Sequence, residues 1–197
     1  MTNKKGARPS REEAEDAVRT LLSWIGEDVA RPGLKRTPLR VLGTFEDWYA
    51  GYEQDPYELL RNSHQPVRDY NRIVSLCNID FASHCEHHMA PIIGKIHIAY
   101  LPGERLAGIS KLVRVVEALT RRLQVQERLT AEIAKCIEDC LAPRGVAVVI
   151  EAKHQCMTTR GVNKTNIKMV TNEMTGEFLS NESVRNEFMQ LIDQSAD

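Results

Sequence analysis

Apolar residues recur at helical spacing in the first quarter of the chain. Ser10 and Glu13 form the pattern of a capping box, and an apolar stripe with a 3.6-residue period follows them. A second amphipathic helix is expected to begin at Thr37 and to end near Gly51. The segment Met1–Pro9 is polar and basic, and we expect it to be poorly ordered.

The period changes to two at Ile73, which predicts a strand running to Phe81. A second strand-like run, Ile92–Leu101, stops at a Pro-Gly pair. Two stretches of helical spacing follow, and then a continuous apolar run at Val146–Ala152, a candidate strand around Ile167–Thr171 and a final helix. The expected order is two helices, two strands, two helices, two strands and one helix.

This order indicates the α+β class, with an antiparallel four-stranded sheet and two helices on one of its faces. We expect residues 1–70 to form an N-terminal helical extension, irregular at 55–71, and residues 71–197 to form the main domain. Such a sheet leaves a second face and two edges exposed, which is a liability for a monomer. We therefore expect a ring-shaped oligomer in which the sheets of several copies join into a barrel.

Length, charge and cysteine content limit the kinds of protein that this chain can be. The 197 residues carry 26 Lys and Arg against 27 Asp and Glu, so no overall field favours nucleic acid or an anionic membrane. No apolar run is long enough for a membrane span, and the polar N-terminus does not look like a secretion signal, so we expect a cytoplasmic protein. Five cysteines, an odd number, argue against a disulfide framework, and we interpret Cys136 and Cys140 as core residues.

A cysteine and three histidines are concentrated between the first two predicted strands. Cys85 and His88 have the spacing at which one turn presents a thiolate and an imidazole to zinc. Cys156 is the natural third ligand, and it shares a face with His154 if that segment is extended. Three ligands leave a fourth position for water, as in catalytic zinc sites, with His87 and His154 beside the metal to move protons. A closed structural site, with His87 or His154 as fourth ligand, fits the same residues.

Cations gather in two places. Lys111 and Arg114 stand one turn apart near the start of a helix that Ser110 is expected to cap, which makes an anion site or, alternatively, a solvated basic face. Arg160 adds a cation close to the expected metal. Because the chain has no glycine-rich phosphate loop, a triphosphate would have to be held by these side chains.

Glu127 lies at the junction of two predicted helices. Its carboxylate can accept two parallel hydrogen bonds from an amidine-like edge such as that of guanine. A capping or salt-bridging role fits an isolated glutamate equally well.

Taken together, four motifs resemble GTP cyclohydrolase I of the zinc-dependent type. They are Cys85-Glu86-His87-His88, Ser110-Lys111-x-x-Arg114, Gln124-Val125-Gln126-Glu127-Arg128-Leu129-Thr130 and His154-x-Cys156-Met157-x-x-Arg160-Gly161-Val162. The resemblance runs from about Ile73 to Ile192 without a departure at a catalytic position, and the two N-terminal helices match in pattern only.

The resemblance implies the tunnelling fold, assembled from two pentameric rings into a homodecamer with active sites at subunit interfaces. Residues 71–197 would then be the catalytic domain. It also implies hydrolysis of GTP at purine carbon 8, with release of formate and formation of 7,8-dihydroneopterin triphosphate. That reaction is the first step of folate or other pterin biosynthesis.

The resemblance further implies a role for each matching residue. The Zn²⁺ ligands would be Cys85, His88 and Cys156; the acid–base residues would be His87, His154 and Ser110; guanine would contact Glu127 and Gln126; and the triphosphate would contact Lys111, Arg114 and Arg160. Two rivals remain open. One is a non-catalytic module of the same fold with structural zinc, and the other is a different enzyme of that fold acting on a pterin or deazapurine.

Overall fold

The computed structural model describes residues 8–61, 64–66 and 70–195, in two compact units, Met1–Trp48 and Tyr49–Asp197. Residues 1–7, most of the segment expected to be poorly ordered, lie outside the described residues. The domain division expected at residue 70 stays a prediction. None of the described helices has the length and apolar character that a bilayer span requires.

The first unit holds α1 (Arg11–Trp24) and α2 (Thr37–Trp48), as the periodicity predicted. The capping box is confirmed, because the backbone N–H of Glu13 donates to Ser10 Oγ and the Ser10 N–H donates to the Glu13 carboxylate. The apolar stripe of α1 has little cover within one chain, with Leu21 62% and Trp24 82% exposed.

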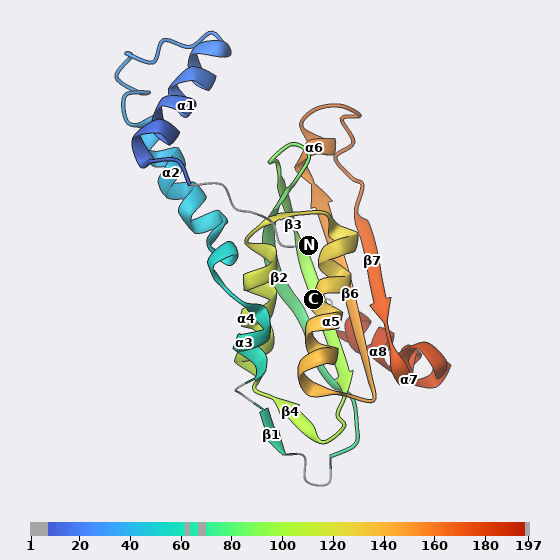
Figure 1. Cartoon of the computed structure of the whole chain (residues 1–197). Helices are drawn as coiled ribbons and strands as arrows, with labels where there is room; N and C mark the ends of the chain where they lie inside the picture. The colour runs from blue at the N-terminus through green and yellow to red at the C-terminus, as the bar shows by residue number, and fades with distance from the viewer. Residues whose placement is uncertain (1–7, 62–63, 67–69, 196–197) are drawn as a thin grey trace. The chain divides into compact units, whose positions relative to one another are not determined.

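The second unit is built on a five-stranded sheet in the order β5–β2–β3–β6–β7 (Figure 1). Its strands are β2 (Val74–Cys85), β3 (Pro91–Leu101), β5 (Leu123–Gln124), β6 (Gly145–His154) and β7 (Met169–Met174). Four strands are antiparallel neighbours, as expected. Strand β5, which pairs in parallel with the end of β2, was not predicted, because two residues show no periodicity.

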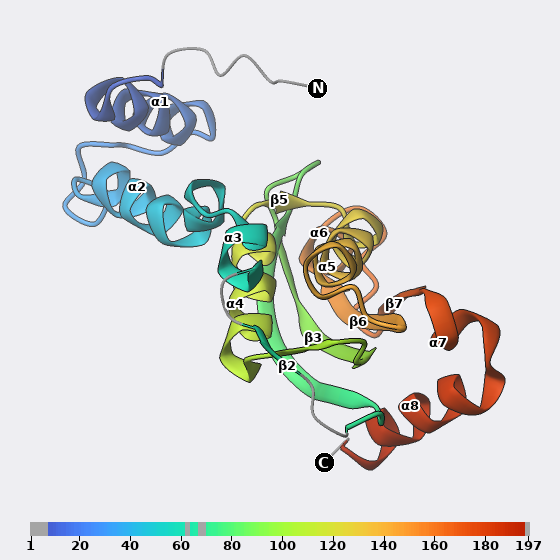
Figure 2. The ribbon, with the colours of Figure 1, turned by 60° about the horizontal axis from the view of Figure 1, so that its bottom comes forward.

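Helices α4 (Ile109–Thr120) and α5 (Gln126–Leu141) lie on the same face of the sheet (Figure 2). Their apolar stripes pack on one set of alternating strand residues, including Ile96 and Ile98 of β3, and the buried Cys136 and Cys140 of α5 belong to this core, as predicted. The other face is covered at one end by α7 (Gly176–Ser180) and α8 (Glu182–Gln194). The second face of the sheet was expected to be exposed, and it is partly covered by these two helices.

A β-bulge divides β2 into two halves. Odd-numbered residues face one side of the sheet in the first half and the other side in the second half. The register shifts between Leu76 and Ile79, and Asn78 adopts a left-handed φ of 58°. Before the bulge Cys77 packs toward α7 and α8, whereas after it Ile79 and Phe81 pack toward α4 and α5. The uniform alternation expected for this strand is therefore wrong, because one extra residue reverses the facing.

The expectation that segment 55–71 is irregular is also wrong for part of its length. It follows a 3₁₀ turn, η1 (Ala50–Glu53), and contains α3 (Pro56–Arg61) and β1 (His64–Pro66), which pairs with β4 (Arg105–Ala107). Asp55 Oδ1 accepts a hydrogen bond from Tyr57 N–H at the start of α3 (2.8 Å). A six-residue helix is too short for a periodic signal, yet it buries Leu60 completely.

Candidate metal centre

Cys85 is the last residue of β2 and the first of a tight turn into β3, as the sequence predicted. The backbone N–H of Cys85 donates to Ala90 O (2.8 Å), and the Met89 N–H donates back to Cys85 O (2.8 Å). Glu86 N–H donates to Gln124 O (3.1 Å), which ties the turn to β5. These bonds fix the backbone from which Cys85 and His88 project.

Cys156 reaches the same place from the end of β6. The strand ends at His154, and Cys156 lies in the one-turn helix α6 (Gln155–Thr158). The segment is therefore not extended, which was the condition for His154 and Cys156 to share one face, because the Thr159 N–H donates to Gln155 O and closes a helical turn. Since β3 pairs with both β2 and β6, the two cysteines nevertheless lie at the same end of the sheet.

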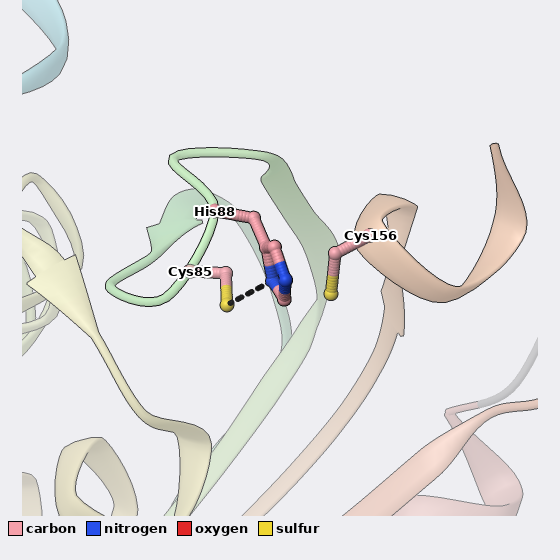
Figure 3. Close-up of side chains that lie close together, drawn as sticks. All are labelled: Cys85, His88 and Cys156. Carbon is pink, nitrogen blue, oxygen red and sulfur yellow. Dashed lines mark hydrogen bonds between the residues drawn. The ribbon is translucent and has the colours of Figure 1, made fainter. Parts of the chain in front are cut away.

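The ligand atoms of Cys85, His88 and Cys156 all lie within 4.8 Å of one another, and the side chains point toward a common centre (Figure 3). Zinc bonds of about 2.0–2.3 Å in tetrahedral geometry separate ligand atoms by roughly 3.5–3.8 Å, so a small inward movement suffices. Two sulfurs and an imidazole form a donor set that suits zinc. Cys85 is buried and His88 is exposed, so the cluster is accessible from one side.

When no cation is present, a negative charge on one of the two cysteine sulfurs disfavours a second negative charge on the other. Burial, with the neighbouring Cys85 sulfur as the second cause, raises the pKa of the Cys156 thiol. A divalent cation between two sulfurs reverses this effect and binds them as thiolates. The arrangement therefore fits a metal ion.

His87 lies beside the cluster and outside the group of mutually close ligand atoms found among the described residues. Its Nδ1 is 3.7 Å from Cys85 Sγ, and its side chain is exposed. Arg160, also exposed, donates from Nη1 to His88 Nε2 (2.7 Å). The expected cation therefore lies beside the cluster of Cys85, His88 and Cys156.

His154 is half-buried and does not join the ligand group among the described residues. Burial lowers its pKa, and the charge of Glu127 opposes that shift. Its Nε2 lies 2.9 Å from Oε1 of Gln126, the buried first residue of α5. Glu127 follows at an exposed position on the first turn.

An ion pair that the sequence analysis missed links the turn after β2 to α5. Arg128 Nη2 lies 2.6 Å from the Glu86 carboxylate. The opposite charges occur inside two of the four motifs, but the two residues are 42 positions apart in the sequence, and nothing in the sequence shows that they pair. This contact holds the turn that carries Cys85 and His88 against the helix that carries Glu127.

Ser110, Lys111 and Arg114 lie elsewhere. They occupy the first turns of α4, whose N-cap is Gly108, so the expectation that Ser110 caps this helix is wrong. The helix follows β4, where Ala107 N–H donates to the Tyr100 hydroxyl (3.0 Å) at the far end of β3.

Cys85 is at the opposite end of β3, because Ser83 pairs with Ile92. The strand from Ile92 to Tyr100 spans about 26 Å at ~3.3 Å per residue. Figure 1 shows α6 at one end of the sheet and β4 at the other. The structure thus brings the metal cluster, His87, His154, Gln126, Glu127 and Arg160 together in one chain, and it leaves the α4 residues outside.

Comparison with known proteins gives consistent matches. The family model described as GTP cyclohydrolase I matches residues 14–193. GTP cyclohydrolase 1 of Maricaulis maris (strain MCS10) is 50% identical over 188 residues, covering 95% of this chain and 92% of that protein. The Hyphomonas neptunium (strain ATCC 15444) protein of the same name is 50% identical, covering 95% and 91%. The apo form of the archaeosine synthase QueF-Like aligns at 12% identity over 55% of this chain and 97% of that chain, with a TM-score of 0.44, too low to carry a conclusion.

Proposed function

The chain belongs to the GTP cyclohydrolase I family, and we propose on that premise that it hydrolyses GTP at purine carbon 8. The products are formate and 7,8-dihydroneopterin triphosphate, and the reaction is the first step of pterin and folate biosynthesis. The observation that carries the proposal is the convergence of Cys85, His88 and Cys156 beside His154 and Glu127.

Cys85, His88 and Cys156 would hold Zn²⁺. When bound there, zinc supplies the Lewis acidity that makes water a nucleophile near neutral pH. An open site is favoured over a closed structural one, because His87 and His154 stand outside the group of close ligand atoms among the described residues. The exposure of His88 leaves room for water and substrate on that side.

Two histidines would move protons. His154 would protonate the purine nitrogen next to carbon 8, and its lowered pKa makes its protonated form a stronger acid. His87, exposed beside the cluster, would act in ribose opening and in the later rearrangement, with Ser110 near the sugar. Each such transfer typically contributes ~10²–10⁴-fold in rate.

The substrate would be held at both ends. Glu127 would accept two hydrogen bonds from guanine, and its exposure leaves the carboxylate accessible. Arg160, Lys111 and Arg114 would bind the triphosphate.

Lys111 and Arg114 would serve such a site from another copy of the chain, because within one chain the first turns of α4 follow β4, at the end of β3 opposite Cys85. We therefore propose a homodecamer of two pentameric rings with active sites between subunits. The long edge and partly open second face of the sheet support assembly of this kind.

Shared sites predict complementation between inactive variants. Cys156→Ala and the double variant Lys111→Ala with Arg114→Ala should each be nearly inactive alone. Co-expressed at equal levels, they should recover about a quarter of the wild-type formate release, because that fraction of two-chain sites receives both intact halves. Mixed assemblies, verified with two affinity tags, that stay as inactive as the parents would contradict sites shared between copies.

Glu127→Ala should raise the KM for GTP at least ~10-fold and leave zinc content unchanged, because a bidentate charge-assisted contact is lost while the metal ligands stay in place. Steady-state kinetics and metal analysis on the same preparation measure both effects. The matched control is Glu132→Ala, because Glu132 lies on the same helix more than one turn after Glu127. This variant should behave as wild type. An unchanged KM for Glu127→Ala would remove Glu127 from the guanine site.

The reaction itself is tested by incubating purified protein with GTP, with and without a chelator. We expect chelator-sensitive formate and the fluorescence of an oxidised neopterin product. GTP binding without either product would favour the non-catalytic module, and a different pterin product would favour another enzyme of the same fold.

A further inference from the structure

Gln126 is almost fully buried, with 1% of its surface exposed, although it stands at the first position of α5. Its amide nitrogen lies within hydrogen-bond distance of Ile150 O (3.1 Å), Met169 O (3.2 Å) and Thr171 Oγ1 (3.1 Å). All of these bonds are internal to the protein, in strands β6 and β7. An amide engaged in this way does not turn toward a substrate without breaking these internal hydrogen bonds.

The orientation of this amide follows from its neighbours. Thr130 Oγ1 donates its hydrogen to the backbone oxygen of Gln126 (2.7 Å). The Thr171 hydroxyl, 2.7 Å from Thr130 Oγ1, must then donate to Thr130, and its oxygen is left to accept. Since the two carbonyls also only accept, the group that faces all three oxygens is the NH₂ of Gln126.

The amide oxygen of Gln126 is therefore fixed toward His154. It lies 2.9 Å from Nε2 of that histidine. An amide oxygen only accepts, so Nε2 must carry a hydrogen, and the neutral ring keeps its lone pair on Nδ1. Nε2 of His154 is therefore occupied by its hydrogen bond to the buried amide oxygen of Gln126.

We propose that Gln126 is a positioning residue, which holds His154 in the Nε2–H tautomer and fixes its ring so that Nδ1 is the nitrogen that exchanges protons with the substrate. This inference rests on the proposed function. In the exchange a proton leaves or joins Nδ1, Nε2 keeps its own hydrogen, and the ring passes between imidazolium and the neutral tautomer that the Gln126 oxygen stabilises. The family resemblance places Gln126 at guanine with Glu127; the internal bonds of its amide give it this different task.

The kinetic test compares variants of similar volume. Gln126→Met removes the acceptor for Nε2 and should lower kcat ~10²-fold while KM for GTP stays within about threefold. Gln126→Glu keeps an oxygen facing Nε2, and its protonated carboxyl can still donate to Ile150 O, so it should recover at least about tenfold of that loss. The matched control is Thr120→Val, which removes the polar group of another buried side chain, one that donates to Val116 O rather than to His154. It should keep kcat within about threefold of wild type.

A rise in KM as the main effect of Gln126→Met would restore the guanine contact and overturn the proposal, as would unchanged constants. If Gln126→Met does not fold, the proposal is tested by the tautomer of His154 in the zinc-loaded wild-type chain, measured by NMR. In ¹⁵N-histidine-labelled protein, with His154 assigned by His154→Gln, Nε2 should show the shift of a protonated nitrogen and Nδ1 that of an unprotonated one. The reverse tautomer would overturn the inference. This spectrum needs no turnover, so failure of wild-type formate release would count against the proposed function alone.

Discussion

Cys156→Ala is expected to lose bound zinc and GTP hydrolysis together, with formate release falling at least ~10³-fold. Cys156 supplies one of two sulfurs and is the only member of the cluster that comes from β6 and α6. Without it, Cys85 and His88 remain on one turn, and a pair of ligands holds zinc far more weakly than three do. Metal analysis after dialysis and formate release from the same sample measure the two losses.

The fold should survive this change, because Cys156 is only half-buried and α6 is a single turn at the end of the sheet. Circular dichroism and size-exclusion chromatography check this point. Cys77→Ala is the matched control, since Cys77 is also partly buried but lies in the first half of β2, on the side of α7 and α8. It should keep its zinc and its activity. Full zinc occupancy in Cys156→Ala would remove Cys156 from the ligand set.

His87→Ala should keep zinc and GTP binding but lose ~10²–10⁴-fold in turnover, the usual contribution of one proton transfer. The side chain is exposed and makes no part of the core, so its removal should not disturb the sheet or the cluster. Zinc content, GTP affinity by calorimetry and single-turnover formate release separate the three properties.

The neighbouring histidine provides the contrast. His88→Ala should lose zinc, since His88 is one of the three mutually close ligands. Two adjacent histidines that are both exposed would then give opposite results in the metal analysis. Loss of zinc from His87→Ala as well would mean a closed site with four protein ligands.

Local patterns in the sequence predicted the local parts of this structure. The capping box at Ser10 predicted the start of α1, and the spacing of Cys85 and His88 predicted a turn between two strands that brings a thiol and an imidazole together. These features depend on residues within one turn of each other, where sequence spacing and spatial spacing agree. The short β5 and α3 were missed because neither is long enough to show a period.

Contacts between distant segments needed the structure. Periodicity assigns a residue to a face but does not report an inserted residue, so the bulge at Asn78 reversed the expected facing of Ile79. The hydrogen bonds of Gln126 to β6 and β7 leave no trace in its own motif. The position of Lys111 was accessible in principle, because a helix that starts just after the second strand of a hairpin begins at the end opposite the hairpin turn.

The most direct test of the account is a zinc titration of the metal-free chain with formate release from GTP measured at every step. We expect activity to rise in proportion to zinc and to level off at about one zinc per chain, as a single three-ligand site in each copy requires. Substantial formate release from the metal-free chain, or a chain that fills with zinc and releases none, would contradict it.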